Sequence, residues 1–420
     1  MSGFDLLVCT VGGASEPLIA SILGHRPERT VFIASPQTES AIRDSIAPAV
    51  TSHSEPFSLT PGNHDVVVVS DAQDFTACVA RIREAYGQHI APWLARGSSF
   101  SVTVDFTGGT KCMTAALALV ARHWNCGFSY VGGTDRTKDG VGIVVSGKEQ
   151  IVHAANPWDT FGFEAVEQAS LLFNHGDYSA AGRILATAKQ RAGDETKRGL
   201  NTLEQLCDGY DLWDRFQHRD AATRLAAVSK NGNDIRAWFG GHGGELLSTI
   251  QRHVELLNQL PTVSRMFVLD LLANARRCAF RGRYDDAVAR LYRACEAAAQ
   301  FRIAELGLSE RADGKVRVEK LPELLKEQWN GRRVDETGMP LGVQDGYELL
   351  REVNDPLGLK FFEIGLGDRK QSPLNERNNS ILAHGQSPIS TRGYEKLRDR
   401  LNELLQVGET DLPVFPMLRW

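Results

Sequence analysis

The sequence predicts a chain of two parts, an α/β region at the N-terminus followed by an all-α region. Up to residue 150, short runs of β-branched and apolar residues alternate with helix-like stretches. From about residue 157 to residue 406, apolar residues recur at spacings of three and four instead. With 420 residues, of which 42% are apolar, the chain is long enough for two or three domains that each bury a core.

The N-terminal strands are predicted from runs that are apolar throughout, which is typical of strands buried on both faces. The candidate strands cover residues 4–10, 30–34, 66–70, 100–106, 127–131 and 142–145. Helical patterns separate them at residues 16–23, 37–46, 72–86 and 110–124. This alternation predicts a parallel, doubly wound sheet of Rossmann type, whose ligands bind beyond the carboxyl ends of the strands.

The helical region contains two similar segments that each open an Ala-rich helix. One begins at Gly176-Asp-Tyr178 and the other at Gly282-Arg-Tyr284. Because there are only two copies, about a hundred residues apart, we interpret them as two helix-hairpin turns and not as a solenoid.

Composition excludes several classes of protein. The seven cysteines are odd in number, scattered and without a C-x-x-C pair, which is typical of reduced thiols and indicates neither disulfides nor a zinc site. No apolar run approaches the roughly 20 residues that span a bilayer, and no secretory leader is evident. A net charge of −5 gives no whole-protein signal for nucleic acid. We therefore expect a cytoplasmic protein without a metal site, in which any RNA contact comes from local clusters.

Two glycine turns follow predicted strands and open predicted helices. The first reads Thr10-Val11-Gly12-Gly13-Ala14-Ser15, with Ser15 as a candidate N-cap, and the second reads Asp105-Phe106-Thr107-Gly108-Gly109-Thr110-Lys111. A helix N-terminus with such donors favours anions, phosphates above all. Neither turn matches a G-x-G-x-x-G or P-loop pattern, so NAD binding and ordinary ATP hydrolysis are disfavoured. The alternative is that the glycines merely make tight turns.

This pair of turns resembles the ligand-binding motifs of CARF domains, the CRISPR-associated Rossmann-like sensors of cyclic oligoadenylate. The resemblance covers about 150 residues, and the D-F-T-G-G-T-K stretch is its most specific part. It implies a homodimer whose turns line one two-fold symmetric pocket for the ring. The residues implied to bind cyclic oligoadenylate are Val11, Gly12, Gly13, Ser15, Thr107, Gly108, Gly109, Thr110 and Lys111.

A second candidate site lies near the C-terminus, in a segment that runs from Ser372 to Gly385. Ser372 suits a helix N-cap and Gly385 a helix stop, so we expect one helix with Arg377, Ser380 and His384 on one face and Ile381 turned to the core. Arg377 and His384 would lie about 10 Å apart along that helix, too far to surround one phosphate in a single copy. A two-fold partner would bring two guanidiniums and two imidazoles together for metal-free attack by a ribose 2′-hydroxyl. The alternative is a surface arginine and a histidine that caps the helix.

An arginine followed by Asn378, five more residues and a histidine resembles the R-x(4–6)-H motif of HEPN ribonucleases. The order CARF then HEPN is similar to the ancillary ribonucleases of type III CRISPR antiviral defence. This resemblance implies a sensor domain at 1–155, a helical connector at 156–260 and a HEPN domain at 261–420. It implies catalysis by Arg377, Asn378, Ser380 and His384, a single-stranded RNA substrate, a 2′,3′-cyclic phosphate product, no cofactor, and cyclic oligoadenylate as allosteric activator.

Two alternatives remain open at this point. The helical region could bind a partner protein or DNA without catalysis, although no basic helix-turn-helix is apparent. The sensor could also degrade its own activator, in which case Thr107 and Lys111 are the residues to mutate.

Overall fold

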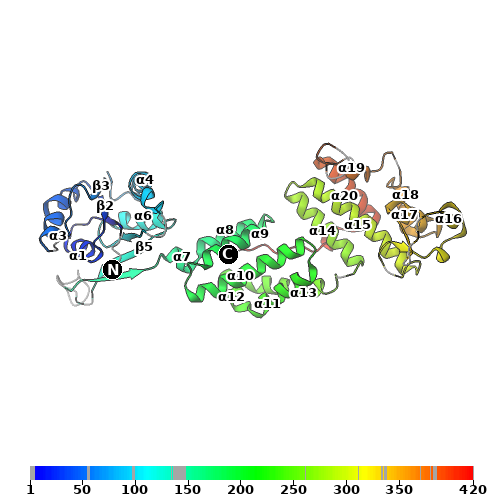
Figure 1. Cartoon of the computed structure of the whole chain (residues 1–420), viewed down its shortest axis with the longest axis horizontal. Coiled ribbons are helices and arrows are strands. Elements are labelled where there is room, and N and C mark those ends of the chain that lie inside the picture. Colours follow the sequence, from blue (N-terminus) through cyan, green and yellow to red (C-terminus); the bar gives the residue numbers. More distant parts are fainter. Residues whose placement is uncertain are drawn as a thin grey trace. The chain divides into compact units, whose positions relative to one another are not determined.

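A computed structural model describes the protein as two compact units, residues Met1–Phe163 with Arg191–Gly193, and residues Glu164–Gln190 with Asp194–Trp420 (Figure 1). The residues that it describes are 5–53, 57–96, 100–133, 135, 148–260, 262–310, 312–332, 334, 338–368, 370–378, 380–381 and 386–419. None of the helices in this part of the chain is long and apolar enough to cross a membrane.

The first unit is built on one six-stranded sheet with the order β3-β2-β1-β4-β5-β6. Its strands are β1 (Leu6–Thr10), β2 (Arg29–Ala34), β3 (His64–Val68), β4 (Val102–Asp105), β5 (Gly127–Gly132) and β6 (Gln150–Ala154). The first five pair in parallel, which confirms the predicted Rossmann-like sheet. β6 adds to the edge antiparallel to β5 and was not predicted. The strand predicted at residues 142–145 lies outside the described residues.

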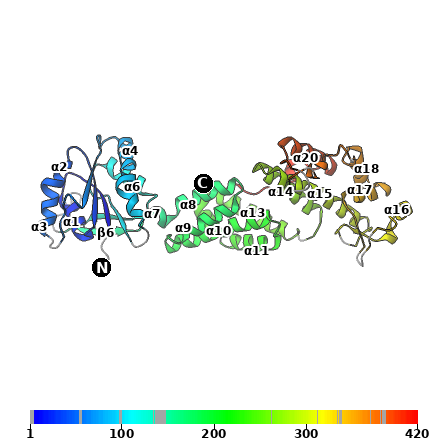
Figure 2. The same ribbon diagram turned by 45° about the horizontal axis from the view of Figure 1, so that its top comes forward.

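Helices cover both faces of this sheet (Figure 2). The helices of this unit are α1 (Glu16–His25), α2 (Glu39–Ala41), α3 (Ala47–His53), α4 (Phe75–Ala85), α5 (Ala91–Leu94), α6 (Lys111–Ala121) and α7 (Pro157–Phe161), with π-helical turns at Ile42–Ile46 and Tyr86–Ile90. Alternate residues of β1 enter two separate cores. Leu6 and Val8 pack with α4 and α6, whereas Leu7 and Cys9 pack with α1 and α3. This two-sided burial is the reason that β1 is apolar along nearly its whole length.

The second unit is almost entirely helical, as predicted. Its first six helices are α8 (Phe163–Asn174), α9 (Tyr178–Lys189), α10 (Asp194–Asp214), α11 (His218–Lys230), α12 (Gly232–Phe239) and α13 (Gly243–Leu257). The later ones are α14 (Arg265–Phe280), α15 (Tyr284–Glu305), α16 (Glu323–Gln328), α17 (Val343–Glu352), α18 (Pro356–Glu363), α19 (Asn375–Asn378) and α20 (Thr391–Leu405). A two-stranded ribbon pairs β7 (Lys315–Val316) with β8 (Met339–Pro340).

Both predicted hairpin turns are present, between α8 and α9 and between α14 and α15. Gly176 and Gly282 have φ angles of +83° and +71°, a backbone conformation that favours glycine. In each turn the residue after the glycine donates its N–H to a carbonyl five residues back, which ends the first helix in a Schellman-type turn.

Buried polar contacts join α14 to the helices that precede it. The Asp270 carboxylate has no exposed surface, accepts the Trp213 indole N–H at 2.8 Å and lies 2.9 Å from the His218 imidazole. Next to Trp213 on α10, the Asp214 carboxylate accepts Arg277 at 2.8 Å and Arg281 at 2.7 Å. These bonds bind α10, α11 and α14 into one unit.

The segment after α20 returns to the earlier helices (Figure 1). The Phe415 ring lies 4.7 Å from both Tyr210 and Trp213. The Arg277 guanidinium lies 3.9 Å above the same ring, which is a cation–π geometry. Asn174 and the backbone of Leu418 exchange two hydrogen bonds, of 2.9 and 2.8 Å. The last described residues thus complete the core around α10.

Replacing Asp270 by alanine is expected to destabilise the second unit by about 3–5 kcal/mol, because it leaves buried donors of Trp213 and His218 without their acceptor. The measurement is urea unfolding followed by tryptophan fluorescence. The exposed Glu255→Gln on α13 is the control and should change the free energy of unfolding by less than about 0.5 kcal/mol. Equal stability of the two variants would contradict the role of Asp270.

The His253 side chain predicts a dependence of stability on pH. Burial, followed by the charges of Arg252 and Arg277, lowers the pKa of His253 from its ordinary 6.5 to about 4, and the ring is hydrogen-bonded to the Tyr210 hydroxyl at 2.9 Å. The unfolded chain therefore binds a proton between pH 6.5 and 4 that the folded chain does not. A contribution of about 3 kcal/mol should be complete above pH 6.5 and lost as the pH falls to 4. Unfolding of wild type and His253→Gln across this range measures it, and parallel pH profiles would refute it.

Candidate ligand-binding and nuclease sites

The two glycine turns of the first unit lie against one another at the carboxyl end of the sheet. β1 and β4 are neighbours, with Cys9 opposite Asp105, so the segments that follow them meet. A Cβ on Gly12 would lie 2.7 Å from the backbone nitrogen of Gly109, and a Cβ on Gly108 would lie 2.5 Å from the carbonyl oxygen of Thr10. Gly109 also has a φ angle of +84°. Close packing of the two turns therefore explains the glycines at these positions.

A fully buried carboxylate, that of Asp105, holds the second turn in place. It accepts the hydroxyls of Ser21 at 2.7 Å and Ser129 at 2.8 Å, and the backbone N–H of Thr107 at 2.9 Å. Burial, and then the charge of Asp105, raises the pKa of the Cys9 thiol well above its ordinary value, so this thiol stays protonated. Sequence reasoning noted Asp105 within its motif but missed Ser21 and Ser129, because α1 and β5 carry them from distant parts of the chain.

Two of the hydroxyls predicted to bind ligand are engaged within the chain. Thr107 accepts the N–H of Val131 at 2.7 Å, and Thr110 caps α6 by accepting the N–H of Met113 at 3.2 Å. Thr110 also donates to the carbonyl oxygen of Ala72 at 2.5 Å. Val11 is buried, and its N–H donates to Ile33. These side chains hold the turns in shape. A ligand at this edge would therefore contact mainly backbone atoms and the Lys111 ammonium.

The remaining predicted ligand residues lie at the surface of this edge. Gly13 and Lys111 are exposed, and Lys111 is the first residue of α6. Within the described residues, the Lys111 ammonium has no ion-pair partner. Ser15 precedes α1 as predicted but makes no side-chain capping bond. The edge therefore combines glycine backbone, two helix starts and one ammonium, a set of groups suited to phosphate.

The helix predicted across residues 372–384 is wrong in its extent. The helical segment there, α19, covers only Asn375–Asn378, and Ser380 forms an isolated bridge with Ser387. The Ser380 hydroxyl and N–H both donate to the carbonyl oxygen of Arg377, at 2.9 and 3.3 Å. A serine that takes a helix carbonyl in this way competes with the next helical turn. Arg377 and Ser380 thus do not share one helix face, and Ile381 is 58% exposed where we had expected a core residue.

Arg377 is held beside α15. Its guanidinium carbon lies 5.3 Å from the centre of the Tyr292 ring, in a cation–π arrangement. Burial raises the pKa of Tyr292, and so does the charge of Glu296, whereas Arg377 opposes the shift. The Tyr292 hydroxyl therefore stays protonated.

His384 lies outside the described residues, and so does the side chain of Asn378. The segments on either side of residues 382–385 are both anchored. Ile381 donates its N–H to Ser387 at 3.2 Å, and Ile389 donates to the Asp285 carboxylate of α15 at 3.2 Å. The described residues on both sides of His384 are thus tied to one another and to α15, the helix that also carries Tyr292.

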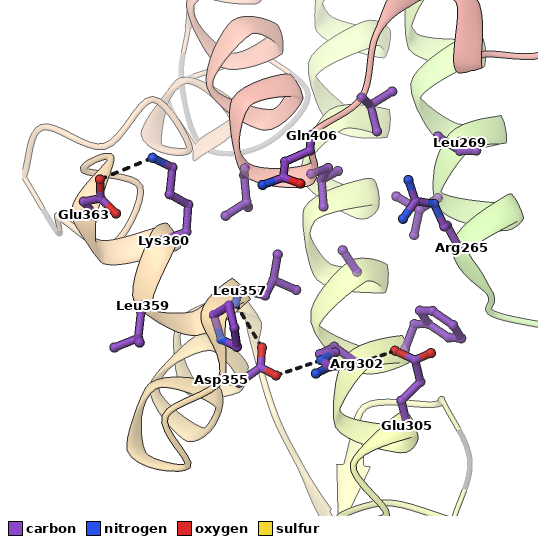
Figure 3. A pocket seen from close by; sticks show the side chains of 17 residues that line it. Arg265, Leu269, Arg302, Glu305, Asp355, Leu357, Leu359, Lys360, Glu363 and Gln406 are labelled. Atoms are coloured by element: carbon purple, nitrogen blue, oxygen red, sulfur yellow. Dashed lines mark hydrogen bonds and ion pairs between the residues drawn. The ribbon is translucent and has the colours of Figure 1, made fainter.

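A cavity of about 590 Å³ lies among α14, α15, α18 and the end of α20 (Figure 3). Its charged groups neutralise one another, because Arg302 pairs with Asp355 at 2.7 Å and Lys360 with Glu363 at 3.3 Å. None of the predicted site residues that the structure describes lines this cavity. The part of the chain that is described contains no group of three His, Cys, Asp or Glu side chains that could hold a metal ion.

Comparison with known proteins finds two family models on the second unit. Residues 161–243 match the Csm6 6H domain and residues 257–408 match the Csm6 HEPN domain. The second match contains Arg377 and His384. No curated protein sequence is significantly similar to the chain.

A solved structure shares the fold of nearly the whole chain. Csm6 from Enterococcus italicus, bound to cyclic hexa-2′-fluoro-hexa-dAMP, is 15% identical with a TM-score of 0.51 over 97% of this chain and 96% of that chain. Can2 from Sulfobacillus thermosulfidooxidans, in complex with cyclic tetra-adenylate, is 13% identical over 52% of this chain and 68% of that chain. Its TM-score of 0.26 is too low to indicate a shared fold. With a Rossmann-like sheet followed by the 6H and HEPN domains of Csm6, the chain belongs to the Csm6 family of CARF–HEPN proteins.

Proposed function

We propose that this protein is a single-stranded RNA endoribonuclease that cyclic oligoadenylate activates, in type III CRISPR antiviral defence in the cytoplasm. The observation that carries the proposal is the match to the Csm6 HEPN domain across the segment that holds Arg377 and His384. The glycine turns of the first unit support the sensing half, because they join two helix starts and the Lys111 ammonium at one edge of the sheet.

The nuclease step requires two groups with different roles. Arg377 stabilises the charge that develops on the phosphate oxygens, and the cation–π contact with Tyr292 limits where its guanidinium can lie. His384 transfers the proton as the ribose 2′-hydroxyl attacks the neighbouring phosphorus. The bond to the 5′-oxygen breaks, which leaves a 2′,3′-cyclic phosphate and a 5′-hydroxyl. All atoms of this step come from RNA and side chains, so it needs no metal and no cofactor.

A homodimer supplies the two-fold symmetry that the ring-binding site and the nuclease site both need. A ring of identical nucleotides is matched by two copies of the turns, and two copies of Arg377 and His384 surround one phosphate. Activation then requires that the ring binds the active arrangement of the dimer more tightly than the inactive one. Asn378 and Ser380 complete the proposed nuclease motif, with Ser380 fixing the backbone of Arg377.

Arg377→Ala and His384→Ala are each expected to reduce ring-activated cleavage at least about 100-fold, because each removes one group from the transition state. The assay is cleavage of a fluorescent single-stranded RNA in EDTA, with cyclic tri-, tetra- and hexa-adenylate added separately. Arg392→Ala, an exposed arginine on α20, is the control and should keep wild-type activity. Cleavage that persists in both site variants would place the nuclease elsewhere.

Lys111→Ala is expected to weaken binding of the activating ring about 10- to 100-fold, because one charge-assisted contact to phosphate is lost. At saturating ring, cleavage should return to within about threefold of wild type, since the nuclease residues are untouched. Calorimetric titration measures the affinity, with exposed Arg83→Ala on α4 as the control for loss of a positive charge. Unchanged affinity in the Lys111 variant would remove this residue from the sensing site.

A further inference from the structure

A small cavity of about 290 Å³ lies beside the Arg377 helix. Its lining includes Tyr292 of α15, Gln344 and Asp345 of α17, Asp368 between α18 and α19, and Asn375, the first residue of α19. The volume lies just below the range typical of drug-sized ligands, so it suits one ring system rather than an extended molecule. Neither family match assigns a role to this cavity.

Tyr292 links the cavity to the proposed nuclease site. Tyr292 is a lining residue of the cavity, and its ring centre lies 5.3 Å from the Arg377 guanidinium carbon. Asn375, which lines the cavity too, lies two residues before Arg377 on α19. A group held on the Tyr292 ring is therefore a close neighbour of a phosphate held by Arg377.

Two of the polar residues that line the cavity, Asp345 and Asp368, carry hydrogen-bond acceptors only. Asp345 accepts two bonds from Arg332, at 2.6 and 3.1 Å, and Asp368 accepts the N–H groups of Lys370 and Gln371, at 2.7 and 2.9 Å. A carboxylate has about four acceptor positions, so each retains capacity for another donor. The backbone bonds also lower the pKa of Asp368, which keeps it ionised. Two carboxylates repel phosphate, so the cavity suits a neutral group that carries N–H donors.

We propose that this cavity binds one nucleobase of the RNA next to the cleaved bond and selects adenine, cytosine or guanine over uracil. The proposal rests on the ribonuclease function proposed above. The Tyr292 ring supplies the stacking surface that single-stranded RNA uses in proteins. Adenine, cytosine and guanine each present an exocyclic amino group to the Asp345 and Asp368 carboxylates. Uracil has no amino group: it offers a single N–H, at N3, between two carbonyl oxygens to which a carboxylate cannot donate.

The test is to sequence the ends of the fragments that ring-activated protein makes from a random single-stranded RNA. Wild type should cut about 10-fold less often where uracil occupies one fixed position next to the cut. Asp345→Asn replaces an acceptor with an amide that can also donate, so cleavage next to uracil should rise at that position. A misfolded protein could not produce this gain. Glu395→Gln, an exposed acidic residue on α20, is the matched control and should keep the wild-type preference.

Cleavage without base preference at any position next to the cut would overturn the subsite and leave the ribonuclease intact. The same conclusion follows if Asp345→Asn and Glu395→Gln give identical preferences. If wild type cuts no RNA with any ring, the proposed ribonuclease function fails. The base subsite is then tested separately, by measuring how tightly the His384→Ala protein binds RNA homopolymers. Equal affinity of that protein for oligoadenylate, oligocytidylate, oligoguanylate and oligouridylate would then overturn the subsite as well.

Discussion

The carboxylates of Asp270 and Asp214 determine how the helical unit is assembled. Removing a charge from water is costly unless its bonds are replaced, and each carboxylate regains them from helices other than its own. Asp270 on α14 bonds to side chains from α10 and α11. Asp214 at the end of α10 accepts Arg277 of α14 and Arg281, which directly follows α14. This exchange fixes α14, and α14 forms a hairpin with α15, which carries Tyr292. The position of Tyr292, which contacts Arg377, thus depends on buried polar bonds to residues of the 6H domain.

The fold was predictable from the sequence wherever one physical constraint dominated. Strands β1, β2 and β4 were found because burial on both faces leaves a continuous apolar run. The partly exposed strands β3 and β5 were found from their β-branched and aromatic residues. The two hairpin turns were found because Gly176 and Gly282 need a positive φ angle. β6 was missed because it is an edge strand whose residues are mostly exposed, so burial did not select its composition. The helix predicted at residues 372–384 was wrong because the Ser380 hydroxyl competes for a helix carbonyl, a contact that periodicity does not report.

For the candidate sites, the sequence predicted the motifs but not the contacts that their side chains make. Both glycine turns were recognised from the sequence. The sequence did not show that the Thr107 and Thr110 hydroxyls form hydrogen bonds within the chain. Gly108 and Gly109 are required by the approach of Thr10, so the same residues satisfy packing and line the edge where a ligand is proposed. Tyr292 was missed altogether. It lies 85 positions before Arg377 and becomes its neighbour only when α15 and α19 pack.

The position of Phe415 and Leu418 in the core around α10 has a consequence for synthesis of the chain. Asn174 and Leu418 bond to one another although they are 244 residues apart. At about 5–20 residues per second, the ribosome adds Leu418 about 12–50 s after Asn174. Throughout that interval the helices of the 6H domain lack the Phe415 ring, and for about the first 5–19 s they also lack the Asp270 carboxylate of α14. A nascent chain that stops before Phe415 therefore lacks part of the core around α10, and such a product would be less stable than the full chain.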